Sequence, residues 1–149
     1  MASGSDGGHL HPHPTRRHRY RYFFYDKHHS WAGPEEARWS LDITEVEEFG
    51  IFSQADDLEL TDAQGRHLYG VRSGPEGTLL PLGTRSQQVA KFHDSGPHWH
   101  GFPLAPLERN PDPPHPPVRA VPPEVLDRMV IAMLLTKTQR KRLLKGKHA

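Results

Sequence analysis

The stretch QQVAKFHDSGPHWHG, residues 87–101, predicts a strand, a turn and a second strand. Residues 87–93 have the composition of a strand, and a Gly-Pro pair marks the turn that follows. His98 and His100 are two residues apart, so a strand directs both imidazoles to one face and the intervening Trp99 to the other. We therefore expect one face to carry histidines while the other packs into the core.

Four side chains of this stretch are candidate metal ligands within eight residues: His93, Asp94, His98 and His100. Because the chain contains no cysteine, any such site must use histidine and carboxylate. That set suits a catalytic divalent metal such as zinc, with one position open for water. Supporting carboxylates are expected from elsewhere in the chain, namely Asp56, Asp57 or Asp62. We expect no obligatory cofactor, with such a metal as the alternative.

The same histidines also permit chemistry without a metal. Two of His93, His98 and His100 can act as base and acid on an RNA 2′-hydroxyl and its leaving oxygen, with Lys91 stabilising the charged transition state. The competing interpretation is structural: Trp99 packs into the core, and the histidines lie on the surface of a turn. We favour it, because histidine is abundant here, at 12 of 149 residues, and because no HExxH, GxSxG or P-loop motif occurs.

Towards the N-terminus, RYRYFFYD at residues 19–26 has the aromatic composition of a strand. A strand that alternates arginine and tyrosine can bind single-stranded nucleic acid, since rings stack on bases and guanidinium groups meet phosphates. The candidate contacts are Arg19, Arg21 and Tyr22. The alternative, which we favour, is a strand that buries its aromatic face. Residues 1–18 contain mostly Gly, Ser, His and Pro and are predicted to be disordered.

The middle of the chain predicts a short helix. Thr44 and Glu47 have the spacing of a capping box, which favours a helix over residues 45–49 that ends at Gly50. Residues 40–43, just before it, are a short strand candidate.

A β-hairpin is predicted next. Residues 57–60 and 66–71 alternate apolar and polar positions, and Gly65 supplies the positive φ that the turn between them requires. With the segments already described, this gives four or five strands in one antiparallel sheet.

The C-terminal third changes character. Residues 103–123 hold nine prolines, a density that excludes a helix or a central strand and predicts an extended connector. A helix is predicted over residues 123–135, because apolar residues recur there at spacings of three and four: Val125, Leu126, Met129, Val130 and Met133. Thr136 and Gln139 have the capping-box spacing and predict a second helix over residues 137–145.

Charge is distributed unevenly along a chain whose net charge is +1. Residues 1–30 carry five bases and two acids, residues 31–62 carry one base and ten acids, and residues 136–149 carry six bases and no acid. The basic ends can fold back onto the acidic middle or can contact the phosphates of DNA or RNA. For the second possibility, the candidates in the last helix are Arg140, Lys141, Arg142 and Lys145.

The chain has neither the apolar segment of a signal peptide near its first residue nor a run of about 18 apolar residues, so we expect a cytoplasmic protein without membrane contact.

We therefore predict an α+β fold in four parts. These are a disordered tail (1–18), a small antiparallel β-rich domain (19–103), a proline-rich connector (104–122) and a basic helical pair (123–149). For function, we favour a small binding module over an enzyme, in which the basic termini contact nucleic acid or an acidic protein partner. The alternative is a small hydrolase or nuclease that uses the histidines of residues 93–100, with or without a divalent metal.

Overall fold

The strand, turn and strand predicted from residues 87–101 form the centre of the main sheet. In the computed structural model, β4 (Val89–Asp94) pairs antiparallel with β5 (Trp99–Leu104), and β3 (His67–Gly70) pairs antiparallel with the other edge of β4. The structure describes residues 7–29, 37–104, 107–108, 118–119 and 121–149. Its sheets and helices confirm the predicted α+β class.

The pairing register gives the main sheet two chemically different faces. Phe92 of β4 lies opposite Gly101 of β5, and a Cβ at Gly101 would stand 2.1 Å from Phe92 Cδ1, so only glycine fits beneath that ring. Trp99, 4% exposed, lies on the same core face. The intervening pair, His93 and His100, lies on the opposite face. The predicted separation of core and histidines is therefore confirmed.

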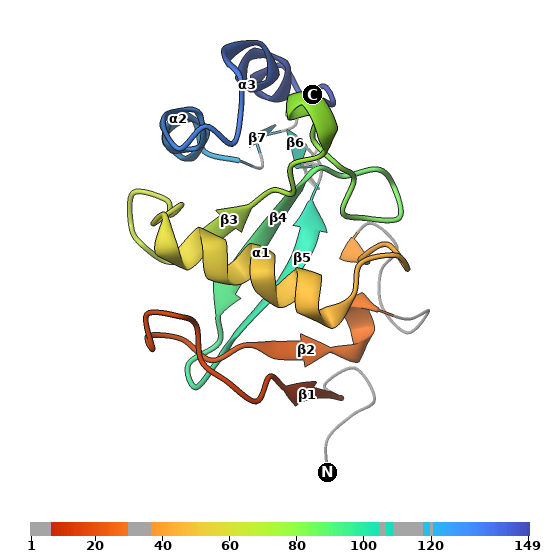
Figure 1. The fold of residues 1–149 in the computed structure, drawn as a ribbon, viewed down its shortest axis with the longest axis vertical. Helices are drawn as coiled ribbons and strands as arrows, with labels where there is room; N and C mark the ends of the chain where they lie inside the picture. The colour runs from red at the N-terminus through yellow and green to blue at the C-terminus, as the bar shows by residue number, and fades with distance from the viewer. Residues whose placement is uncertain (1–6, 30–36, 105–106, 109–117, 120) are drawn as a thin grey trace.

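The core face of the sheet is covered by α1 (Glu45–Asp57) (Figure 1). The helix begins with the predicted capping box, in which Thr44 Oγ1 accepts from the backbone N–H of Glu47 at 3.1 Å. The prediction that it ends at Gly50 is wrong, because the helix continues for two further turns. Burial against the sheet outweighs the cost of a helical glycine, about 1 kcal/mol, and the residues that supply it are Ile51, Phe52 and Ala55.

The longer helix replaces the first strand of the predicted hairpin. Thr61 forms an isolated bridge to Leu68, and residues 57–60 end the helix instead of forming a strand. Residues 40–43 are likewise not a strand, although the preceding Trp39 bridges Gly83. Within the described residues, the main sheet therefore has three strands, fewer than predicted.

Residues 7–18 differ from the disordered tail that was predicted. Here β1 (Gly8–Leu10) pairs antiparallel with β2 (Phe23–Tyr25), forming a second small sheet. The segment is also held by side chains, since the His11 ring stacks on Phe49 of α1 with centroids 3.6 Å apart. Ring stacking and strand pairing supply the stabilisation that the low apolar content of this segment does not.

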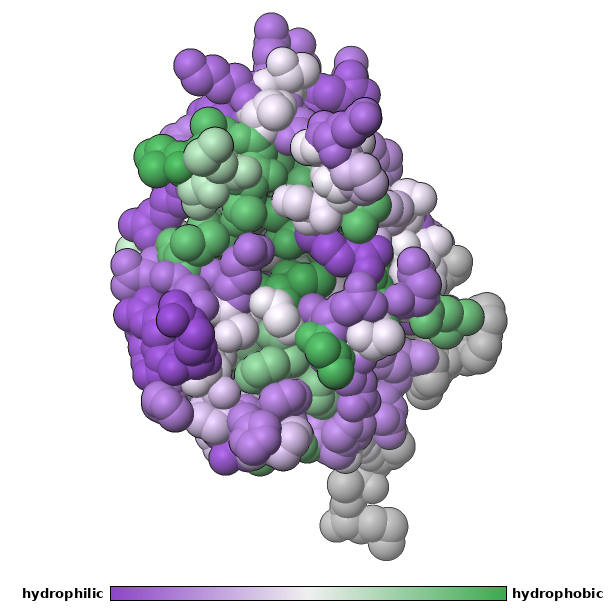
Figure 2. Space-filling view, in the orientation of Figure 1, coloured by the Kyte–Doolittle hydropathy of each residue, from purple (hydrophilic) through white to green (hydrophobic). Residues whose placement is uncertain are grey.

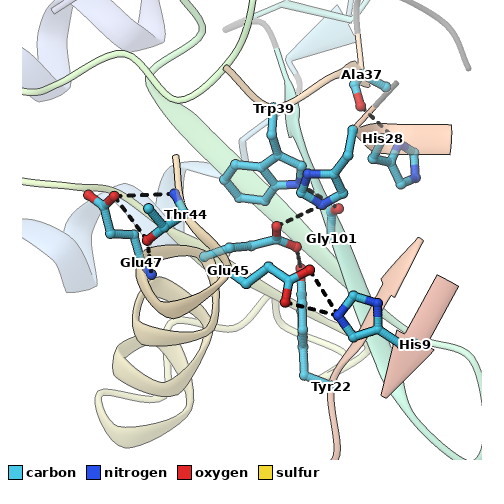
Figure 3. Close-up of polar contacts among 11 residues, drawn as sticks. His9, Tyr22, His28, Ala37, Trp39, Thr44, Glu45, Glu47 and Gly101 are labelled. Carbon is cyan, nitrogen blue, oxygen red and sulfur yellow. Dashed lines mark hydrogen bonds and ion pairs between the residues drawn. The ribbon is translucent and has the colours of Figure 1, made fainter. Parts of the chain in front are cut away.

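Two carboxylate–histidine pairs, one with a buried carboxylate and one exposed, fasten the N-terminal segment to the start of α1 (Figure 3). Glu48 is 1% exposed, accepts a hydrogen bond from the Tyr22 hydroxyl, and places Oε1 2.8 Å from Nε2 of His29. Burial raises the pKa of Glu48, whereas for His29 the adjacent carboxylate outweighs burial and raises the pKa. Glu45 makes a similar but exposed pair with His9 at 2.9 Å. The same chemistry thus occurs once in the core and once at the surface.

At the other end of the molecule, α2 (Pro123–Ile131) and α3 (Lys137–Leu144) form the predicted helical pair (Figure 1). The Thr136 capping box starts α3 as predicted. The first helix ends four residues earlier than predicted, and Met133 takes a left-handed backbone with φ 64°.

Part of the proline-rich connector is described. Two short strands, β6 (Leu107–Glu108) and β7 (Val118–Arg119), pair antiparallel within it. The remainder of the predicted tail and connector lies outside the described residues, at 1–6, 105–106, 109–117 and 120.

Candidate functional site

The face of the main sheet opposite α1 carries four neighbouring imidazoles, which we call the histidine row: His67, His93, His100 and His28. His93 and His100 are cross-strand neighbours with ring centroids 5.7 Å apart. His67 of β3 meets His93 at 4.6 Å, and His28 of the 3-10 turn Asp26–His28 meets His100 at 6.1 Å. Two of the predicted histidines are therefore brought together, and two that the sequence pattern did not single out join them.

His98, the third predicted histidine, contacts β2 and not the row. Its ring stacks on Phe23 with centroids 4.8 Å apart, and its Nε2 lies 3.5 Å from the Tyr25 hydroxyl oxygen. Lys91 of β4 lies opposite Phe102 in the register, on the face that carries the histidine row. Of the predicted catalytic set, His93, His100 and Lys91 thus share one face of the sheet, while His98 precedes β5 and contacts β2.

The carboxylates predicted to support a metal have other partners. Asp94 accepts from the backbone N–H of Gly96 at 2.9 Å, and Asp62 lies 2.8 Å from Nδ1 of His67. Asp56 and Asp57 lie at the far end of α1. Among the residues that the structure describes, no three histidine or carboxylate side chains are arranged to hold a metal ion. The predicted metal site is therefore not assembled in this conformation.

The electrostatics of three rings in the histidine row, His28, His93 and His100, disfavour acid–base catalysis by those rings at neutral pH. Burial lowers the pKa of His28, His93 and His100 from 6.5 to about 4. At pH 7, about one such ring in a thousand carries a proton, so none is a useful general acid, and a base of this pKa is weak. Ser95, which the sequence did not single out, lies 2.7 Å from His100 Nδ1 and gives that ring a neutral partner. The row is suited to neutral packing and polar contact.

The N-terminal arginines are occupied by acids at the end of α1, and we call Arg16, Arg17 and Arg19 the arginine clamp. Arg16 Nε lies 3.0 Å from Asp57 Oδ2, and Arg17 donates to the Asp56 carbonyl at 2.9 Å. Arg19 Nε lies 3.8 Å from Asp56 Oδ1, a carboxylate that is 1% exposed. The clamp therefore pairs with the acids at the end of α1, and Arg19, a predicted nucleic-acid contact, is one of the residues engaged there.

The other two predicted contacts of this segment also face inward. Tyr22 is 0% exposed, and its ring packs edge-on against Phe92 of the core. Arg21 donates to the carbonyl of His11 at 3.0 Å. In this structure Tyr22 presents no ring face on which a base could stack.

A cavity of about 280 Å³ lies beside the arginine clamp. Its lining includes two cations, Arg19 and Arg128, and two acids, Asp56 and Glu59, with Trp99 as one of its walls. The lining therefore carries equal numbers of positive and negative side chains.

The C-terminal helix presents charge in a different way. Lys137, Lys141 and Lys145, which we call the lysine stripe, recur every four residues, so they follow one side of α3 and its C-cap. All three are exposed, and within the described part of the chain none makes an ion pair. At a rise of 1.5 Å per residue the stripe is about 12 Å long. Lys137 was not among the predicted contacts, although its spacing from Lys141 is visible in the sequence.

The two predicted arginines of α3 are partly engaged by the protein. Arg140 Nε lies 2.6 Å from Asp127 Oδ1 of α2, and Arg142 Nε donates to the carbonyl of His148 at 2.7 Å. Both contacts help to hold α3 in place, so the lysines are the cations most available to a partner.

Comparison of the chain with protein-family models, with curated proteins and with solved structures gave no match. Among the helices of the described residues, none has the length and apolar character needed to cross a bilayer.

Proposed function

We propose that the protein binds nucleic acid and that the lysine stripe of α3 contacts the phosphates. This proposal rests on the state of the three lysines. They are exposed and have no ion pair among the described residues, and the segment 136–149 contains no acid that could neutralise them. A charge without an intramolecular partner is free to replace the counterions of a polyanion.

The chemistry and the regular spacing of the lysines favour nucleic acid over an acidic protein as the partner. Lysine ammonium groups are flexible point charges, which suit sequence-independent contacts with a repeating phosphate backbone. The stripe repeats one such charge at each turn of the helix. A regular polyanion satisfies that repeat along its whole length, whereas an acidic protein would have to match it with placed carboxylates.

Binding also fits the histidine row better than catalysis does. Three of its rings are neutral at pH 7 because burial lowers the pKa to about 4, so those three rings are poor candidates for the general acid of the hydrolase alternative. We therefore assign no chemical step to this face.

The test is a salt titration of binding to fluorescent DNA and RNA, single- and double-stranded, between about 50 and 200 mM salt. Three phosphate contacts predict a slope of log K against log salt of about −2.7 for duplex DNA, from three times 0.9. The variant Lys137→Gln/Lys141→Gln/Lys145→Gln should lose that slope. The matched control, Arg16→Gln/Arg17→Gln/Arg19→Gln, removes the same number of positive charges from the arginine clamp. Binding to polyglutamate without binding to any nucleic acid at low salt would overturn the proposal.

A further inference from the structure

Two apolar side chains project from the turn between α2 and α3. Ile131 is 82% exposed and Met133 is 89% exposed. Figure 2 shows apolar surface over α2, at the upper left of the view. The helical periodicity of the sequence predicted Met133 on the buried face, but α2 ends at Ile131 and the turn carries Met133 outward. These side chains therefore contribute little to the core.

Met133 is unfavourable for the fold in two respects. Its φ of 64° lies in the left-handed region, which favours glycine or asparagine after a helix C-terminus. The other non-glycine residues with positive φ in the described part of the chain have polar side chains: His18, Glu59, Glu76 and Ser86. A strained backbone and an exposed thioether at one position point to a contact outside the chain.

The turn that presents Met133 is held firmly and leads directly into the lysine stripe. The backbone N–H of Leu134 and of Leu135 both donate to the Met129 carbonyl, at 2.9 and 3.3 Å. Lys137 follows Met133 by four residues. The exposed apolar pair therefore precedes the first lysine of the stripe by four and six residues, and the turn between them is closed by two backbone hydrogen bonds.

A second exposed apolar pair provides the contrast. Leu41 is 91% exposed and Val46 is 80% exposed, but both lie among acids: Asp42, Glu45 and Glu47. The basic side chains at that site, Arg72 and His9, are engaged by these acids. An exposed apolar side chain does not by itself indicate a nucleic-acid contact. An exposed apolar side chain followed by lysines is complementary to DNA, in which stacked bases lie inside a backbone of phosphates.

We propose that Ile131 and Met133 insert as a wedge at a base step of duplex DNA while the lysine stripe holds the adjacent phosphates, so that the protein bends the duplex. Aliphatic and thioether side chains are used in this way by minor-groove proteins, which partly unstack a step and kink the helix. Flexible pyrimidine–purine steps are the preferred points of insertion. The inference rests on the proposed function. A membrane surface is the less suitable occupant, because interfacial helices bury a broad apolar face and not two side chains.

The experiment measures bending and binding separately. A duplex with one central TA step, labelled at its ends with a fluorescence donor and acceptor, is titrated with the full chain at about 50 mM salt. Wild type should raise energy transfer at saturation. Met133→Gly and Ile131→Ser/Met133→Ser should bind with a small loss of affinity and leave energy transfer at the value of free DNA. Met133→Gly should also unfold at a temperature no lower than that of wild type.

The control replaces the other exposed pair. Leu41→Ser/Val46→Ser should bind and bend DNA as wild type does. If wild type binds DNA and the wedge variants bend it equally well, the wedge is wrong while the lysine stripe survives. If wild type binds no DNA, the proposed function itself fails. Binding of wild type to anionic vesicles, lost in Ile131→Ser/Met133→Ser, in place of DNA bending would also overturn the inference.

Discussion

The arginine clamp and the lysine stripe are similar in sequence and opposite in structure. Each brings several positive charges to one end of the chain. The cations of both are exposed, but those of the clamp have partners at the end of α1, where Arg16 lies 3.0 Å from Asp57. The lysines of α3 have no ion pairs among the described residues. A run of basic residues becomes a binding surface only where the fold leaves it without acids to neutralise.

The helix termini explain the difference. The last turn of α1 contains acids and no base, which is unfavourable at the negative end of the helix dipole, so cations from elsewhere are attracted there. The last turn of α3 already holds its own bases, Lys141 and Arg142. The end of α1 therefore attracts the arginines, whereas the lysines of α3 are without ion pairs among the described residues.

The largest effect should come from removing the buried anchor of the N-terminal segment. Glu48→Ala leaves the buried Tyr22 hydroxyl and the half-buried His29 without their partner and should lower the free energy of unfolding by about 3–5 kcal/mol, measured by urea denaturation. Glu45→Ala is the matched control, because its pair with His9 is exposed, and it should cost about 1 kcal/mol or less. Equal losses would show that burial does not distinguish the two pairs.

Acid should weaken the fold without touching the lysine stripe. His28, His93 and His100 have a pKa of about 4 in the folded protein and an ordinary value of 6.5 when unfolded, so the unfolded chain binds more protons between these limits. Stability should therefore fall as the pH is lowered from 6.5 towards 4. Denaturation curves at several pH values test this.

The variant His93→Phe removes one of these titrating groups while keeping a ring against Phe102, and it should flatten the pH dependence. A free energy of unfolding that stays constant or rises towards pH 5 would contradict the assignment.

Within the clamp, Arg19 should matter more than Arg16. Arg19→Gln leaves the buried Asp56 carboxylate without the guanidinium that faces it and should cost about 1–2 kcal/mol. Arg16→Gln breaks an exposed pair and should cost about 0.5 kcal/mol. Thermal unfolding of both variants gives the ranking, and a larger loss for Arg16 would mean that the clamp acts through Asp57 instead.

The smallest effect on stability should come from the lysine stripe. The variant Lys137→Gln/Lys141→Gln/Lys145→Gln should change the free energy of unfolding by less than about 0.5 kcal/mol, since the three side chains are exposed and unpaired in the described structure. Circular dichroism during urea denaturation measures it. A loss of several times that size would assign the lysines a structural role.

Local signals in the sequence predicted much of the fold. The capping boxes at Thr44 and Thr136 are present, and the strands and turn of residues 87–101 form β4 and β5. The errors arose where tertiary packing overrides local preference. Gly50 does not end α1, because residues beyond it are buried against the sheet. Met133 is exposed, because a turn interrupts an apolar periodicity that continues past it.

The candidate sites were harder to predict because they depend on contacts between distant segments. The two-residue spacing of His98 and His100 predicted both on a strand, but β5 begins at Trp99, so only His100 lies on it. His67 joins the row only through the register of β3 with β4. The pairing of Arg16 with Asp57 spans 41 positions and has no local signature. For the same reason, the sequence could not decide which basic end was free.

The most direct test compares the two triple variants in one experiment, with thermal unfolding and DNA affinity measured on the same samples at about 50 mM salt. The lysine variant should lose about tenfold or more in affinity with an unchanged unfolding temperature. The variant Arg16→Gln/Arg17→Gln/Arg19→Gln should unfold at a lower temperature yet bind DNA like wild type while it remains folded. Equal loss of affinity in both variants, or in neither, would show that the lysine stripe is not the DNA-binding surface.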